Sequence, residues 1–288
     1  MTQALETSGQ VVMIAYRGGQ FVTAPREVPE ETAIAISVNG STHAVMMATP
    51  DHVRDLALGL ALNERIIAVP DEIERLEIEA SELGLDCRLW LTAERASTYV
   101  QRRRQMTGPV GCGLCGVESL ELAARELPMV TAEASLSGHE IARAMDAMST
   151  HQVLGARTRA VHAAAFHDER GHVVTREDVG RHNALDKVAG HLASEGIDSA
   201  AGFLTITSRV SVELIQKAAV MGTGLIAAVS VPTALAIRAA EGAGVTLVAI
   251  ARGEEFEVFT HPWRVAGATP PARNPLPVPE RPLRAAGG

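Results

Sequence analysis

The sequence predicts an α/β protein whose first hundred residues form a smaller α+β domain. Two observations carry this prediction. Between residues 160 and 251, short apolar strand-like segments alternate with amphipathic helical segments, which is typical of a mostly parallel sheet with helices on both faces. Before residue 107, strand-like segments instead come in adjacent pairs with helices between the pairs, as in α+β domains.

The N-terminal elements follow from composition and turn chemistry. The first strand is expected at Val11–Tyr16. Segments 32–38 and 43–48 flank Asn39-Gly40, a dipeptide that favours the primed turns of β-hairpins. Thr49-Pro50-Asp51 then opens a helix, because proline suits its first turn and apolar residues follow at helical spacing. The other expected elements are strands at 72–79 and 86–92 and a helix at 93–105.

The C-terminal elements begin with a helix at 137–151, for which Ser137 is a suitable N-cap. The turn 168–171 joins the first two strands. In chain order, we expect strands at 160–166 and 172–176, a helix at 181–194, a strand at 203–207, a helix at 210–221, a strand at 224–231, a helix at 233–240 and a strand at 245–251.

These elements divide the chain into an N-terminal arm (1–26), an α+β domain (27–107) and an α/β domain (108–266). Residues 267–288 hold six of the fourteen prolines. They cannot bury enough apolar area to offset the entropy lost on ordering, so a disordered tail is predicted.

The composition of the chain argues against some classes of function. A formal net charge of −8 argues against non-specific nucleic-acid binding, which requires a basic surface. The longest apolar run, 222–237, is broken by Pro232 and is shorter than the ~18 residues that suggest a membrane helix. Three cysteines and no signal-peptide pattern favour a reducing cytoplasm.

The stretch Gly-Cys-Gly-Leu-Cys-Gly at 111–116 carries the clearest chemistry. It holds Cys112 and Cys115 in a glycine-rich loop just ahead of a helix expected at 117–127. Unpaired N–H groups and the positive end of the helix dipole favour a thiolate there, so a thiol can fall well below its free pKa of ~8.5. The remaining thiol, Cys87, lies on the apolar face of a strand, where core packing is expected.

Other interpretations of the cysteine pair remain open. Structural zinc normally takes four ligands, often from two such pairs. A zinc deaminase would carry His-x-Glu ahead of Pro-Cys-x-x-Cys, whereas Gly111 precedes Cys112 and the triplet at 162–164 is His-Ala-Ala. A dithiol oxidoreductase or a purely structural loop is also possible. No metal site of the protein's own is expected.

Polar loops follow several strands of the α/β domain, where such sheets bind ligands. The loop 176–183 contains Asp178, Arg181 and His182, and a carboxylate can recognise a guanine edge while arginine holds phosphate. The simpler alternative makes Asp178 a helix cap and Asp186–Lys187 a surface pair.

Arg209, in the loop 207–211, precedes a helix, where a cation is disfavoured unless an anionic ligand joins it. Plain N-capping by Ser208 or Ser211 is the alternative. The loop 231–235 could contact a ligand at the same edge, or it could be an ordinary helix start. At the end of the last strand, Arg252 and Gly253 could approach a phosphate, or simply form a turn. No Walker or Gly-x-Gly-x-x-Gly motif indicates ATP or NAD.

Taken together, these motifs resemble the FdhD family of formate dehydrogenase accessory sulfurtransferases, over about residues 27–264. The motifs that carry the resemblance are Gly-Cys-Gly-Leu-Cys-Gly (111–116), Arg-Glu-Asp-Val-Gly-Arg-His-Asn-Ala-Leu-Asp-Lys (176–187), Thr-Ser-Arg-Val-Ser (207–211), Pro-Thr-Ala-Leu-Ala (232–236) and Thr-His-Pro (260–262).

The resemblance implies a cytoplasmic homodimer with a cytidine-deaminase-like second domain. It implies that Cys112 accepts persulfide sulfur from a cysteine desulfurase, helped by Cys115. The sulfur would pass to molybdenum or tungsten in the bis-molybdopterin guanine dinucleotide cofactor before the cofactor enters the formate dehydrogenase apoenzyme. The cofactor-contact segment falls on Ile250, Ala251, Arg252, Gly253, Glu254 and Glu255, although relatives often have phenylalanine where this chain has Ile250.

A sulfurtransferase is thus the leading hypothesis. The alternatives are a non-catalytic escort that binds the same cofactor and, third, a dithiol oxidoreductase. The choice of metal, the formate dehydrogenase served, the division of roles between the two cysteines, the dimer geometry and the role of the tail stay open.

Overall fold

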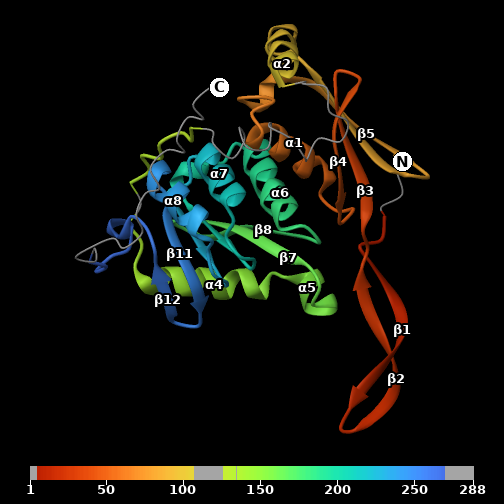
Figure 1. The fold of residues 1–288 in the computed structure, drawn as a ribbon, viewed down its shortest axis with the longest axis vertical. Coiled ribbons are helices and arrows are strands. Elements are labelled where there is room, and N and C mark those ends of the chain that lie inside the picture. Colours follow the sequence, from red (N-terminus) through yellow and green to blue (C-terminus); the bar gives the residue numbers. More distant parts are fainter. Residues whose placement is uncertain (1–4, 107–125, 134, 270–288) are drawn as a thin grey trace, which may run out of the picture.

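A computed structural model describes residues 5–106, 126–133 and 135–269, arranged as a projecting hairpin and two sheet-containing lobes (Figure 1). The hairpin pairs β1 (Ser8–Arg17) with β2 (Gln20–Pro29). It contains the expected strand at Val11–Tyr16, but the predicted arm boundary at residue 26 falls inside β2.

The N-terminal lobe is a four-stranded sheet in the order β4-β3-β6-β5 with α1 packed on one face. Asn39 and Gly40 both have positive φ at the β3–β4 turn, which confirms the predicted hairpin. Cys87 is fully buried in the core, as expected. The elements are β3 (Thr32–Val38), β4 (Ser41–Ala48), α1 (Val53–Asn63), β5 (Ile73–Ser81), β6 (Gly84–Leu91) and α2 (Ala93–Met106).

The C-terminal lobe is built on a six-stranded sheet in the order β12-β11-β10-β9-β7-β8. Helix α4 begins with a full capping box, since Ser137 and Glu140 each bond the other's backbone N–H. The elements are α4 (Gly138–Thr150), α5 (Val153–Thr158), β7 (His162–Asp168), β8 (Gly171–Asp178), α6 (Arg181–Ser194), β9 (Phe203–Ile206), α7 (Val212–Met221), β10 (Leu225–Ala228), α8 (Ala234–Ala243), β11 (Thr246–Arg252) and β12 (Glu255–Val258).

The prediction of a mostly parallel sheet needs correction. Four strands point the same way, but β7 and β12 run against them, so only the pairs β9–β10 and β10–β11 are parallel. Tight turns explain this: β7–β8 and β11–β12 are hairpins, and a hairpin connection makes its two strands antiparallel.

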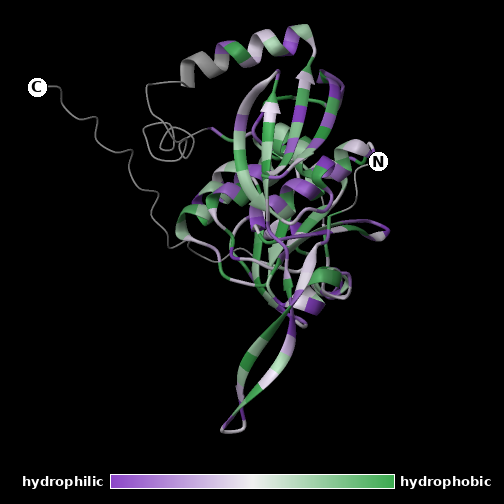
Figure 2. Ribbon diagram, turned by 90° about the vertical axis from the view of Figure 1, so that its right-hand side faces the viewer, coloured by the Kyte–Doolittle hydropathy of each residue, from purple (hydrophilic) through white to green (hydrophobic). Residues whose placement is uncertain are grey.

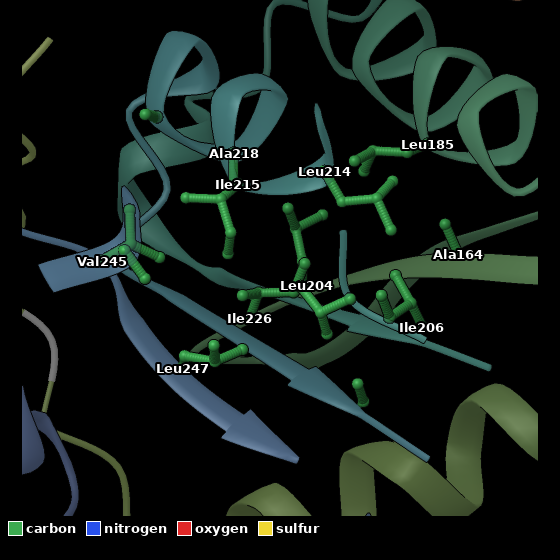
Figure 3. Close-up of a cluster of buried hydrophobic side chains, with 14 of the residues drawn as sticks. Ala164, Leu185, Leu204, Ile206, Leu214, Ile215, Ala218, Ile226, Val245 and Leu247 are labelled. Carbon is green, nitrogen blue, oxygen red and sulfur yellow. The ribbon is translucent and has the colours of Figure 1, made fainter. Parts of the chain in front are cut away.

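Helices cover both faces of this sheet, as predicted (Figure 1). Helices α6, α7 and α8 enclose one core, in which Leu185 and Ile215 face Leu204 and Ile226 of the strands (Figure 3). Helix α4 closes the other face with Ile141, Met145 and Met148. The sheet is therefore a middle layer between helices on both faces.

The two lobes meet where α1 crosses α6 at backbone distance. A Cβ at Gly59 would lie 1.8 Å from the Asp186 carbonyl oxygen, and one at Gly190 would lie 1.9 Å from the Asp55 carbonyl oxygen. Arg176 reinforces the contact, donating to Asp55 Oδ2 from Nε and Nη2 at 2.9 and 2.8 Å. The lobes thus share one tightly packed interface.

The other predicted elements match with shifts of a few residues at their ends, whereas β2, α5 and β12 were not anticipated. The cysteine loop, nearly all of the helix expected at 117–127 and most of the tail lie outside the described residues. None of the helices in the described part of the chain has the length and apolar character of a membrane span.

Candidate functional site

The carboxyl ends of β8, β9, β10 and β11 meet along one side of the C-terminal sheet. Backbone hydrogen bonds join the loops that follow these strands. Val210 N donates to Val231 O at 3.2 Å, and Ile250 N donates to Ser230 O at 3.3 Å. The structure thus brings together the predicted loops. We call this region, residues 178–182, 207–211, 229–233 and 250–254, the carboxyl edge.

Asp178 is fully buried at this edge and fixes the loop that leads into α6. Its Oδ1 accepts from Gly180 N at 2.8 Å and from Asn183 Nδ2 at 2.9 Å. Its Oδ2 accepts from Thr49 N at 3.1 Å and pairs with Lys187 Nζ at 2.7 Å. A ligand would have to displace these groups to reach the carboxylate, so the guanine contact expected at Asp178 stays a prediction.

Lys187 is equally buried and also donates to Thr49 O at 3.0 Å and Glu177 O at 3.3 Å. Burial lowers the pKa of this ammonium, and the adjacent Asp178 carboxylate opposes the shift. Because Thr49 belongs to the N-terminal lobe, Lys187 and its partners fix the middle of α6 to that lobe as well as to the end of β8.

The alternative of an Asp186–Lys187 surface pair is wrong. Asp186 is buried and accepts from Lys217 Nζ at 2.6 and 2.7 Å and from Asn63 Nδ2 at 2.7 Å. Burial raises the pKa of Asp186, while Lys217 opposes that shift. Adjacent residues on a helix point in different directions, so the sequence already contained the signal against this pair. Its true partners come from α1 and α7.

Arg181 and His182 open α6 at the same edge. Among the described residues, Arg181 Nε is one of three buried side-chain polar atoms without a hydrogen-bond partner. Burial, followed by the positive charges of Arg181 and Lys217, lowers the pKa of His182 to about 4. Its Nε2 lies 3.5 Å from Ser211 Oγ. The site therefore combines a cation and a neutral imidazole at a helix start.

His162, a neighbour that sequence reasoning did not promote, begins β7 beside the Asp178 end of β8. Burial, and then the charge of Arg181, lowers its pKa as well. An anion bound near Arg181 would offset both the unfavourable cation at the α6 N-terminus and the field on the two histidines.

Arg209 is exposed in the loop before α7. Ser211 is the N-cap residue of α7, yet its side chain makes no capping hydrogen bond to the helix. Ser211 therefore occupies the N-cap position that the plain alternative assigned to it, although without the capping hydrogen bond, and Arg209 stands at a second helix start on the carboxyl edge.

The segment 250–255 joins β11 to β12. Ile250 has φ +55°, a conformation that costs strain for a β-branched residue, and the β11–β12 register shifts between Ala249 and Arg252. Ala251 is buried. The residues exposed at the turn are Arg252, Gly253, Glu254 and Glu255. The strained Ile250 is thus bonded to Ser230 within the carboxyl edge, and the charged residues follow it at the exposed turn.

Cys112 and Cys115 lie outside the described residues, and their predicted roles stay predictions. Cys87 is described: burial, followed by the nearby Asp86, raises its pKa to about 12. At neutral pH it is a protonated, enclosed thiol, which is a poor nucleophile.

Comparison with known proteins shows to which family the chain belongs. The model of the FdhD/NarQ family matches residues 29–266. The chain belongs to the FdhD/NarQ family. A relative called sulfur carrier protein FdhD, from Agrobacterium fabrum, is 48% identical over 258 residues, covering 89% of this chain and 95% of the relative. The Brucella abortus protein of the same name is 47% identical over 260 residues, covering 90% and 97%.

The fold also matches a solved FdhD-like structure. A crystal structure described as a formate dehydrogenase accessory protein from Desulfotalea psychrophila superposes with a TM-score of 0.71 at 24% identity. The match covers 90% of this chain and all of that one. At this identity the likeness bears on the fold alone.

Proposed function

We propose that this chain is a sulfur carrier that takes persulfide sulfur onto Cys112 and delivers it to the bis-molybdopterin guanine dinucleotide cofactor, with molybdenum or tungsten, before insertion into formate dehydrogenase. One observation carries the proposal: the chain aligns over nine-tenths of its length with relatives named sulfur carrier protein FdhD. The burial of Cys87 leaves Cys112 and Cys115 as the candidate carriers.

The chemistry balances in two steps. The Cys112 thiolate attacks the outer sulfur of a donor persulfide, the donor's S–S bond breaks, and the donor cysteine leaves as a thiolate. Release of the carried sulfur as sulfide then consumes two electrons. Cys115 supplies them when its thiol attacks the inner sulfur, which forms a Cys112–Cys115 disulfide and frees the outer sulfur for the metal. An external dithiol reduces that disulfide before the next cycle.

The carboxyl edge is the proposed seat of the nucleotide part of the cofactor. Arg181 and Arg209 stand at the starts of two helices, where N–H groups and dipoles favour phosphate. The neutral His182 can hydrogen-bond a base. The segment from Ile250 to Glu255 is the proposed contact for the rest of the cofactor, and Asp178 holds the loop from which Arg181 and His182 project.

The decisive experiment is intact-protein mass spectrometry after incubation with a cysteine desulfurase and cysteine. Wild type and a Cys87→Ala control should each gain the mass of one sulfur atom, which reductant removes. Cys112→Ala should gain none, whereas Cys115→Ala should keep the adduct but fail to release it. An adduct that persists in Cys112→Ala would refute the assignment of the carrier residue.

A second candidate, the cofactor escort without sulfur transfer, is favoured by the unpartnered Arg181 Nε, which suits ligand binding rather than cysteine chemistry. Isothermal titration calorimetry with GDP tests whether the carboxyl edge binds a guanine nucleotide. Arg181→Ala should weaken binding at least tenfold, while Arg170→Ala, exposed at the opposite end of the sheet, should not. Cofactor binding and formate dehydrogenase activation by a Cys112→Ala, Cys115→Ala double variant would favour the escort.

The remaining expectations belong to the same proposal. A cysteine desulfurase and apo-formate dehydrogenase are the proposed partners, the cytoplasm is the proposed location, and a homodimer is the proposed assembly. A cytidine-deaminase-like topology of the C-terminal lobe likewise remains a proposal.

A further inference from the structure

Trp263 lies exposed at a surface cavity of the C-terminal lobe. The residue is 62% exposed, and the chain has one other tryptophan, Trp90. An aromatic ring at the wall of a cavity offers a binding surface to another segment or molecule. The cavity has a volume of about 420 Å³ and is lined by Thr131, Ala132, Glu133, Ser135, Trp263 and Arg264.

Buried contacts hold the lining of this cavity in place. Arg264 is buried and donates to Ala132 O from Nε and to Gly244 O from Nη1, each at 2.7 Å. The His261 ring meets the Trp263 ring edge-on, with the ring centres 4.5 Å apart. A surface that is fixed before its ligand arrives loses little conformational entropy on binding. The cavity is therefore preorganised.

The rim of the cavity is acidic. Glu133 is exposed in the lining. Glu241 is exposed nearby, since its carboxylate lies 3.9 Å from Nε2 of His261, whose ring contacts Trp263. The cation among the lining residues, Arg264, directs its N–H groups at backbone carbonyls. The cavity should therefore attract a ligand that combines an apolar surface with positive charge.

The chain leaves the lobe beside this cavity. Ala266 N donates to Leu136 O at 2.8 Å, and Leu136 directly follows the lining residue Ser135. Three described residues come after Ala266, and residues 270–288 then follow in the sequence. A chain spans up to ~3.3 Å per residue, so the seven residues from 270 to 276 can reach about 23 Å. That length allows a return to Trp263.

Residues 270–288 have the composition that the cavity requires. They include six prolines, three arginines and one glutamate. Proline-rich segments favour the polyproline II helix, which has three residues per turn. In that helix Leu276, Pro279 and Pro282 would share one face, and Arg281 and Arg284 would share another. Aromatic-lined grooves bind such helices through their prolines.

We propose that residues 276–284 dock in this cavity of their own chain as a polyproline II helix. The apolar face of that helix covers the Trp263 ring, and its arginine face meets Glu133 and Glu241. Attachment to the lobe gives the segment an effective concentration at the cavity on the order of millimolar. A modest intrinsic affinity is therefore enough to keep the segment docked.

The exposed hydrophobic residues of the projecting β1–β2 hairpin are too distant to cover Trp263. They are visible along the hairpin in Figure 2. Trp263 follows β12 in the sequence, and β12 and the hairpin lie on opposite sides of the molecule (Figure 1). The C-terminal segment, by contrast, begins beside the cavity. Of the two, residues 276–284 are the occupant within reach.

The test measures acrylamide quenching of Trp263 fluorescence in the full chain. A Trp90→Phe background leaves Trp263 as the sole tryptophan. The triple variant Leu276→Ser, Pro279→Ser, Pro282→Ser removes the apolar face. It should raise the Stern–Volmer constant roughly twofold, because a docked segment covers one of the two faces of the indole ring. An unchanged constant would overturn the proposal.

A matched control changes three residues outside the docking segment: Pro270→Ser, Pro271→Ser, Ala286→Ser. It should be quenched like its parent, and a rise equal to that of the first triple variant would contradict the assignment of residues 276–284. Far-UV circular dichroism and Tm establish that all variants are folded.

A charge reversal tests the acidic rim in the same assay. Glu133→Lys should raise the quenching constant, because its ammonium repels the arginine face of the segment. Adding Arg281→Glu and Arg284→Glu to Glu133→Lys should restore the parent value. Failure of this rescue would exclude the proposed orientation of the segment.

A photocrosslinker placed at Val278 shows which chain supplies the segment. It should yield a product with the mass of one chain, joined within residues 131–135 or 261–266. A product of twice the chain mass, a link elsewhere in the chain, or crosslinking only to an added protein would each overturn docking within one chain. The proposal goes beyond sulfur transfer and does not depend on it, because no outcome here involves sulfur.

Discussion

Replacing Lys187 with methionine should destabilise the protein by roughly 3–5 kcal/mol, the usual cost of breaking a buried ion pair from one side. The Lys187 side chain and its partner Asp178 are both fully buried, with the charged atoms 2.7 Å apart. Methionine has a similar shape but no charge. The variant would therefore leave Asp178 as a buried carboxylate without its counter-ion.

The hydrogen bonds of Lys187 place the loss at the top of this range. Its ammonium also donates to the carbonyls of Thr49 and Glu177, and a buried acceptor left without a donor costs ~1–3 kcal/mol. For a chain of this size a loss of ~5 kcal/mol corresponds to a fall in Tm of about 10–20 °C. The contact between the lobes at Thr49 should loosen first.

Thermal unfolding followed by circular dichroism measures this loss, with the exposed Arg170→Met as a control that should stay within ~0.5 kcal/mol of wild type. A Tm within 2 °C of wild type at neutral pH would refute the ion-pair reasoning.

Two further predictions test packing and pH dependence. Gly59→Ala should cost at least ~2 kcal/mol, since its Cβ would meet the Asp186 carbonyl, whereas Gly242→Ala in open space should add ~0.5–1 kcal/mol; equal Tm values would contradict the helix crossing. Burial, with smaller effects from His172 and His151, lowers the pKa of His167 to about 3, below the ordinary value of ~6.5. Stability should therefore fall by up to ~4 kcal/mol as pH drops from 6.5 toward 3, and His167→Phe should flatten this slope in urea titrations at several pH values; an unchanged slope would exclude His167 as its source.

Local chemistry predicted much of the fold. The turn at Asn39-Gly40, the cap at Ser137 and the helix from Arg181 to Ser194 depend on neighbouring residues, and the sequence contains them in full. Strand β2 was missed because Gln20–Pro29 includes two prolines and no regular alternation. The order of the strands in the sheet could not be predicted for a different reason. Strand β7 lies between β8 and β9, and its pairing with β9 depends on packing between residues far apart in the sequence.

The candidate site divides in the same way. The loops at Arg181, Arg209 and Ile250 could be predicted, because polar residues after apolar strands gather at one edge of a sheet. The side-chain partners could not. Asp186 is satisfied by Asn63 and Lys217, which lie 123 and 31 residues away in the sequence, and nothing near Asp186 signals either contact.

The crossing of α1 and α6 has a consequence for how this protein folds and diversifies. Because Gly59 and Gly190 carry no side chain that would keep α1 and α6 apart, the two helices pack backbone to backbone. Neither lobe could separate from the other without exposing that packed face. The chain should therefore unfold in one cooperative transition. A fragment that keeps only one lobe should be unfolded and degraded by proteases. Evolution could therefore lengthen the loops or exchange the terminal segments of such a chain, but it could not shuffle the lobes as independent modules.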